Sequence, residues 1–231
     1  HVALLTGRNA AALIGRHEGP YPGPELRDLL NAGRTLPRLA RLAGRRVAFA
    51  NAFTPVFHDR MARGKARWSA FGLTCELAGL TIRGAVELAG GRAVSSWPTN
   101  RAWAELGHPM PVIDAIEAGR NLARLALDHD LTLYEYFACD FAGHRADRDL
   151  MVRSVDELDQ VVAGAWPILA ANGGSLVIVS DHGNVEDWTI RGHTLGPATF
   201  VAAGPIAASS RDVSSLTDVA PAMLRYLGVL D

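Results

Sequence analysis

Two short polar segments of this chain combine carboxylates and imidazoles at spacings that suit metal binding. Asp140 and His144 form the pattern D-x-x-x-H, and Asp181 and His182 open the segment D-H-G-N. His193 follows eleven residues after His182, beyond a polar loop. Carboxylate and imidazole ligands without a thiolate favour Mn²⁺ or Zn²⁺, the borderline metals of hydrolytic sites. These five residues therefore predict a divalent metal site.

Each piece has an ordinary explanation when taken alone. Asp140 and His144 could form a loop salt bridge or cap a helix, and a loop histidine such as His193 is usually just solvated. Asp181 with His182 is more specific because it follows a strand-like run. The three pieces in this order favour a joint metal site over three coincidences.

Two predicted strands position these segments. Residues 131–138 and 176–180 read as strands, the second being the β-branched run LVIVS, and each ends just before one polar segment. Residues 112–127, 148–171 and 217–227 read as helices, and residues 198–203 read as a further strand. Strands that alternate with helices predict an α/β fold with a mostly parallel sheet and helices on both faces. Ligands bind at the carboxyl ends of strands in such sheets.

The first half of the chain is harder to interpret. Residues 2–13, 24–30 and 35–43 read as helices, and residues 46–50 as a short buried strand. Residues 51–110 contain a helix-like stretch but also many Gly, Pro and Trp positions, and we expect a small insertion there. The whole of 1–231 is predicted to be a single domain.

Composition excludes several classes of protein. The 231 residues are 48% hydrophobic and 20% charged, with a net charge of -1, so nothing global favours nucleic acid or a membrane surface. No apolar run approaches the roughly 18 residues of a membrane span. Two cysteines are too few for a disulfide scaffold and favour a reducing compartment, so we expect a cytoplasmic protein.

The order D-x-x-x-H, D-H-G-N, H-T resembles the alkaline phosphatase superfamily, and within it the branch of cofactor-independent phosphoglycerate mutase and phosphopentomutase. The closing segment 215–228 is similar to the last helix of that branch, and Ala3 to Gly7 is similar to the helix after the superfamily's nucleophile. The resemblance is strong over residues 131–228, fair over 1–14 and loose between them.

The resemblance implies two divalent ions, Mn²⁺ or Zn²⁺. Asp140, His144 and His193 would hold one ion, and Asp181 and His182 the other. In the family an Asp near the chain start and a Ser or Thr nucleophile complete the second site. Both would lie upstream of His1, so we expect this chain to lack the first strand of an alkaline phosphatase-like domain.

The function implied is phosphoryl transfer on a small phosphorylated substrate. Hydrolysis is favoured over a mutase reaction because only 132 residues separate Gly7 from Asp140, too few for a large cap domain. A sulfatase or another esterase of the superfamily remains an alternative, and so does a non-catalytic metal-binding module.

Four neighbouring residues are weaker candidates for supporting the ligands or touching substrate. Asn184 and Glu186 could orient the ligand histidines, or could simply build a loop. Thr194 could bond a phosphate oxygen or cap a turn, and His17 lies in a loop that could reach the substrate.

Overall fold

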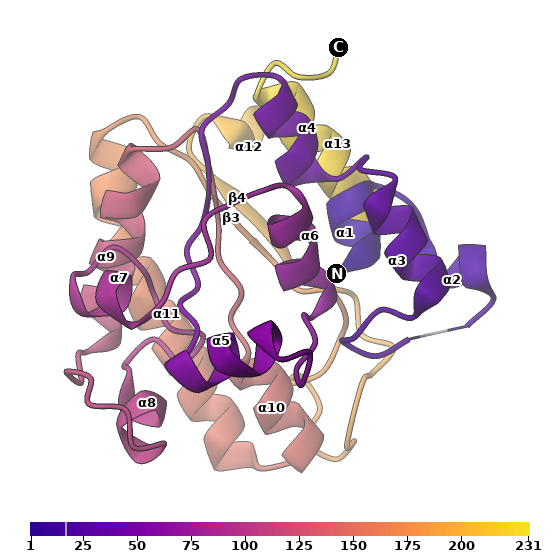
Figure 1. Cartoon of the computed structure of the whole chain (residues 1–231). Coiled ribbons are helices and arrows are strands. Elements are labelled where there is room, and N and C mark those ends of the chain that lie inside the picture. Colours follow the sequence, from indigo (N-terminus) through magenta and orange to yellow (C-terminus); the bar gives the residue numbers. More distant parts are fainter. Residues whose placement is uncertain (17) are drawn as a thin grey trace.

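Helices surround a small amount of β-structure in the computed structural model, which describes residues 1–16 and 18–231 (Figure 1). The strands are β1 (Val47–Phe49), β2 (Leu131–Leu133), β3 (Leu176–Val179) and β4 (Phe200–Ala203). The helices are α1 (Val2–Thr6), α2 (Ala10–Ile14), α3 (Pro24–Asn31), α4 (Leu36–Leu42), α5 (Pro55–Ala62), α6 (Ala70–Leu77), α7 (Ala85–Ala89), α8 (Arg101–Glu105), α9 (Ala115–Leu127), α10 (Ala138–Arg145), α11 (Arg148–Ala171), α12 (Ile206–Ser209) and α13 (Leu216–Tyr226). The α/β class predicted from the sequence is confirmed.

The strands form two separate pairs rather than one extensive sheet. β1 and β2 are parallel, with Ala48 opposite Thr132, whereas β3 and β4 are antiparallel, with Ile178 opposite Val201. The mostly parallel sheet that we expected is therefore not shown. The connections explain the difference, because β1 reaches β2 through a long crossover that contains five helices, while β3 returns to β4 through a loop without a helix. A parallel pair needs a crossover, whereas an antiparallel pair can be joined by a loop.

Apolar layers cover the strands on two sides. Leu5 of α1, Phe71 of α6 and Met223 of α13 belong to the largest core cluster, against which Val177 and Val179 of β3 pack. On the other side, residues of α9 and α11 pack together with Leu176. Figure 1 shows α9 and α11 on one side of β3 and β4, and α1, α4 and α13 on the other.

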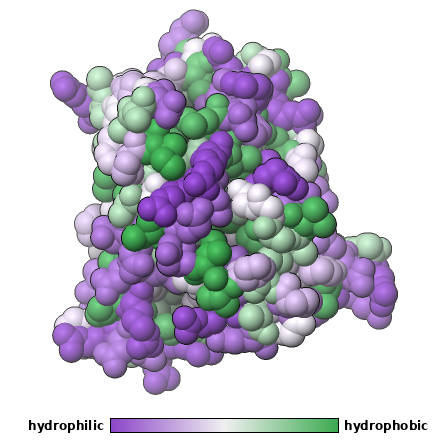
Figure 2. All heavy atoms as spheres, turned by 90° about the vertical axis from the view of Figure 1, so that its left-hand side faces the viewer, coloured by the Kyte–Doolittle hydropathy of each residue, from purple (hydrophilic) through white to green (hydrophobic). Residues whose placement is uncertain are grey.

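The pair α9 and α11 makes an unusually close backbone contact. A Cβ atom on Gly119 would overlap the carbonyl oxygen of Val161, and one on Gly164 would overlap the carbonyl oxygen of Ile116. The two helices can approach this closely only because both positions are glycine. Figure 2 looks onto the side of the molecule that carries these helices, where hydrophilic side chains alternate with smaller apolar patches.

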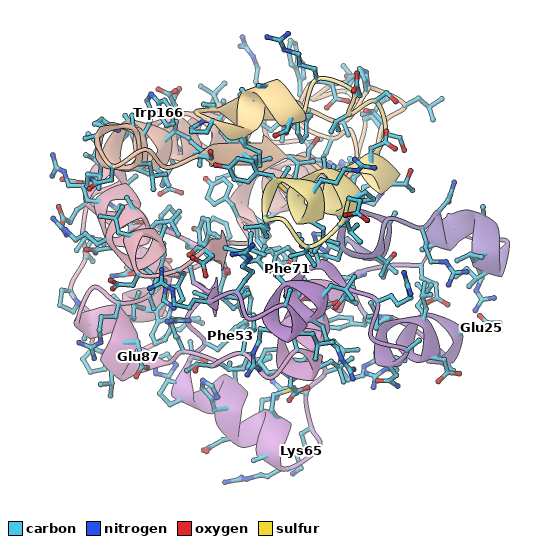
Figure 3. All side chains as sticks on the ribbon, turned by 90° about the horizontal axis from the view of Figure 1, so that it is seen from above. Glu25, Phe53, Lys65, Phe71, Glu87 and Trp166 are labelled. Carbon is cyan, nitrogen blue, oxygen red and sulfur yellow. The ribbon has the colours of Figure 1, made fainter. Side chains whose placement is uncertain are left out.

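Residues 51–110, predicted as a small insertion, contain α5 to α8. Part of this segment belongs to the main core, because Phe71 and Cys75 of α6 are buried there with α1 and α13. Figure 3 shows Phe53 and Phe71 toward the middle of the molecule, with Glu25 and Lys65 at its margin. The division of the chain into a domain and an insertion stays a prediction. No helix among the described residues is long and apolar enough to cross a membrane.

Candidate metal centre

The first polar segment lies on a helix and not at the end of a strand. β2 ends at Leu133, five residues before the predicted end of that strand, and α10 begins at Ala138. The spacing of Asp140 and His144 is the one that places two side chains on the same face of a helix. His144 Nε2 accordingly lies 3.3 Å from Asp140 Oδ1.

The second segment follows β3 directly, as predicted. His182 Nε2 lies 3.4 Å from Asp181 Oδ1 and 3.5 Å from Asp140 Oδ1, so it faces both carboxylates. His193 comes from the far end of the loop, and its Nε2 lies 3.9 Å from Asp140 Oδ1. Its ring stacks on that of His182, with centroids 3.6 Å apart, and lies 5.2 Å from the ring of His144. The structure therefore brings all five predicted ligands together.

The surroundings of Asp140 Oδ1 fit a bound cation. Three imidazole nitrogens lie within 4 Å of this oxygen, yet it is buried and has no hydrogen-bond partner. A buried carboxylate oxygen without a partner is costly, and a cation would satisfy it. One ligand atom from each of Asp140, His144 and His193 lies within 4.8 Å of the others. This set of oxygen and nitrogen donors suits a divalent metal of the Mn²⁺ or Zn²⁺ kind.

Two further residues, not identified from the sequence, border the second segment. Glu135 follows β2 by two residues, and its side chain is 5% exposed, with Oε1 lacking a hydrogen-bond partner. His1 Nε2 lies 3.5 Å from Glu135 Oε1 and 3.4 Å from Asp181 Oδ2. Burial, and next the charge of Asp181, raise the pKa of Glu135 to about 8. Glu135 interrupts the apolar run of the predicted strand 131–138, which was a signal in the sequence, whereas the contact with residue 1 left no signal.

The loop that joins His182 to His193 is tied together by Glu186. Its Oε2 accepts a hydrogen bond of 2.6 Å from the backbone N–H of Asn184, and its Oε1 accepts one from the hydroxyl of Thr194. The hydroxyl bond, above the other causes, lowers the pKa of Glu186, so the carboxylate stays ionised. The Thr194 N–H also donates to the carbonyl of Gly183 at 3.0 Å. These bonds hold the residues next to His182 and His193 against each other.

Asn184 joins this loop to α10. Its side-chain amide donates to the carbonyl of Gly192 at 3.1 Å, and its Oδ1 approaches Gly143 so closely that a Cβ there would overlap it. Asn184, Glu186 and Thr194 thus tie the loop together beside His182 and His193, while a role in orienting the histidines and a contact with a substrate stay predictions. His17, the fourth weaker candidate, lies outside the described residues.

Comparison with known proteins places this chain in a family of metal-dependent enzymes. Residues 110–231, more than half of the chain, match the model of the metalloenzyme superfamily, so the chain belongs to that superfamily. The resemblance seen in the motifs is confirmed, and membership implies divalent metal ions.

The curated relatives that it matches are 2,3-bisphosphoglycerate-independent phosphoglycerate mutases. The protein of Legionella pneumophila (strain Lens) is 31% identical over 109 residues, which is 44% of this chain and 21% of that protein. The protein of Saccharophagus degradans is 34% identical over 125 residues, 51% of this chain and 23% of that protein. The matched part is therefore only about a fifth to a quarter of the length of these relatives.

One solved structure supports the fold. The PH0037 protein from Pyrococcus horikoshii superposes with a TM-score of 0.52 over 83% of this chain and 45% of the other. The sequences are 11% identical, so this likeness concerns the fold alone.

Proposed function

We propose that this chain carries the metal centre of a two-metal-dependent phosphoryl-transfer enzyme, which acts as a phosphatase on a small phosphate ester. The observation that carries the proposal is the convergence of three imidazole nitrogens on the unpartnered oxygen of Asp140. Family membership and the names of the relatives support phosphate chemistry rather than another use of a metal.

The ligands divide into two groups. Asp140, His144 and His193 would hold one divalent ion, and Asp181 and His182 the other, with Mn²⁺ or Zn²⁺ as the metals. His182 lies almost equally far from the two carboxylates, so it stands at the boundary of the two positions. When bound, such ions polarise a phosphoryl oxygen and neutralise charge that develops during transfer.

The neighbouring side chains of the protein would then position the metal ligands and would not react themselves. Glu186 stays ionised and holds Thr194 and the Asn184 backbone, which keeps His182 and His193 on adjoining stretches of chain. Orientation of ligand histidines by such neighbours typically changes metal affinity by about 10- to 100-fold.

A mutase reaction is the second candidate, because the curated relatives are mutases. Hydrolysis is favoured by the packing of residues 51–110. Phe71 and Cys75 from this segment are built into the main core, which leaves few residues for a separate cap that would return phosphate to the substrate. A short cap formed by the remaining residues would suit the mutase alternative.

The proposal can be tested by measuring metal content and hydrolysis of 4-nitrophenyl phosphate on the same preparations. Metal-stripped protein, in a version extended upstream of His1 to include the expected nucleophile, should be inactive and should regain turnover with Mn²⁺ or Zn²⁺. His144→Ala and His182→Ala should each lower metal content and turnover. His129→Ala is the matched control, since His129 bonds the carbonyl of Leu125 on α9, away from these ligands. Full metal occupancy of the extended protein without any metal-dependent turnover would contradict the phosphatase and leave only a metal-binding role.

A further inference from the structure

Two exposed aromatic side chains lie on the two segments that carry the predicted metal ligands. The chain has seven Phe and five Trp, and within the described residues only Phe141 and Trp188 among them are exposed, at 38% and 52%. Single exposed aliphatic residues are ordinary on a protein surface. Large aromatic rings that are exposed together beside a polar centre more often belong to a binding surface.

Phe141 is placed by α10, the helix that also carries two predicted ligands. Asp140 and His144 occupy one row along this helix, and Phe141 and Arg145 occupy the adjacent row with the same spacing of four. The guanidinium carbon of Arg145 lies 3.9 Å from the centroid of the Phe141 ring. The ring also meets Trp97 edge-on, with centroids 5.3 Å apart, so it is held from two sides.

Trp188 is placed by the loop whose two ends carry His182 and His193. The guanidinium carbon of Arg148 lies 5.1 Å from the centroid of its ring. Arg148 is the first residue of α11 and follows His144 by only four residues. The same loop exposes Leu195 completely, two residues beyond His193. The loop therefore exposes apolar side chains on both sides of His193.

We propose that this aromatic wall, formed by Phe141, Arg145, Arg148 and Trp188, binds the leaving group of the phosphate ester, and that this leaving group is aromatic. The inference rests on the proposed function, since it needs a phosphate held at the candidate metal centre. The guanidinium groups complement the negative charge of that phosphate, and the rings offer flat apolar faces to a planar partner. A short acyclic polar leaving group would use neither ring.

The test is a comparison of two phosphonates that carry the same charge and cannot be hydrolysed. Phenylphosphonate and methylphosphonate are titrated into the metal-loaded 231-residue chain by calorimetry. Phenylphosphonate should bind about tenfold more tightly, the gain expected from one good aromatic contact. Trp188→Ala should bring the ratio close to one while leaving methylphosphonate affinity unchanged. Trp188→Phe should keep most of the preference.

The outcomes separate this inference from the function on which it rests. Equal affinities for the two phosphonates in the unchanged protein, or a preference that survives the combined change Phe141→Ala and Trp188→Ala, would overturn the aromatic wall. That result leaves the phosphatase proposal intact provided that both phosphonates need metal to bind. Metal-independent binding of methylphosphonate would instead contradict the proposed function. If neither compound binds, both proposals are wrong.

Discussion

The helix pair α9 and α11 and the candidate metal centre are built in opposite ways. Between the helices, Gly119 and Gly164 let the backbones touch, and Ala123 and Ala165 are fully or almost fully buried. At the centre, side chains are half exposed, and a buried carboxylate oxygen of Asp140 lacks a hydrogen-bond partner. One region is complete without any ligand, whereas the other leaves polar groups unsatisfied.

The difference indicates that the helix pair stabilises the fold and that the metal-free centre destabilises it. Close packing of apolar and backbone atoms stabilises the fold directly. An unpaired buried carboxylate and its crowded imidazoles destabilise it until a cation binds. The helix pair can therefore be expected to tolerate metal removal, and the centre to depend on it.

The largest effect is expected from filling the space between the helices. Gly164→Ala places a methyl group against the backbone of Ile116, which cannot move unless the helices separate. The free energy of unfolding should fall by about 3 kcal/mol, as for other overpacked cores. Urea denaturation measures it, with Gly19→Ala as the control, since a Cβ on Gly19 would meet nothing within 4 Å. A loss no larger than that of the control would show that the helices can part freely.

Metal binding should stabilise the protein through the centre and not through the helix pair. At about one hundred times the dissociation constant, Mn²⁺ or Zn²⁺ should raise the free energy of unfolding by about 2.7 kcal/mol. His144→Ala should remove most of this increment, because it deletes a nitrogen that faces Asp140 Oδ1. Gly164→Ala should keep the metal-dependent increase in the free energy of unfolding, although the metal-free variant is less stable than the unchanged protein. A metal increment that is equal in His144→Ala and the unchanged protein would contradict the ligand assignment.

The helix pair and the centre also differ in how far the sequence predicts them. Residues 148–171 were predicted as a helix, and α11 spans the same residues, since Asp147 caps one end and Asn172-Gly173-Gly174 follows the other. The convergence of the five polar residues was predicted from their order alone. In contrast, the antiparallel pairing of β4 and the contact of His1 with Glu135 join residues far apart in the chain. No local pattern of side chains encodes such pairings.

α10 shows a local failure of a different kind. Residues 134–138 are apolar enough to extend a strand, and Asp140 was expected just beyond its end. The chain instead turns into a helix at Ala138, and this places Asp140 and His144, four residues apart, on one helical face. The spacing of four between these two residues was the local signal that favoured a helix over a strand.

A smaller effect is expected from loosening the loop that carries two of the histidines. Glu186→Gln keeps the size of the side chain but replaces one acceptor oxygen by an NH₂ group, so one of its two hydrogen bonds is lost. Metal affinity should fall about tenfold, with little change in the stability of the metal-free protein. Calorimetric titration measures it. Asp187→Asn is the matched control, since the Asp187 side chain accepts hydrogen bonds from Thr189 in the same loop and not from the residues next to the histidines. Equal affinities in the two variants would remove the orienting role of Glu186.

The smallest effect concerns Glu157, where the two regions meet. This residue of α11 accepts a hydrogen bond of 3.0 Å from the hydroxyl of Tyr136, which lies between β2 and α10. Burial raises the pKa of Glu157 above its ordinary value of 4.5, against the opposing effect of the Tyr136 bond. Between the ordinary and the raised pKa the folded protein binds more protons than the unfolded chain, so its stability falls as the pH rises through that window.

Glu157→Gln should abolish this dependence. Relative to the unchanged protein, the variant should gain stability as the pH rises from about 4.5, and should show no gain at lower pH. Glu117→Gln supplies a control of opposite sign, because hydrogen bonds from Arg124 and Arg120 lower the pKa of Glu117. That variant should lose stability at neutral pH, and the loss should disappear as the pH falls through the lowered pKa. Urea denaturation of the metal-free proteins from about pH 2 to about pH 8 measures both. If the two variants changed with pH in the same direction, burial would not be the cause at Glu157, and the boundary between the packed helices and the polar centre would lie elsewhere.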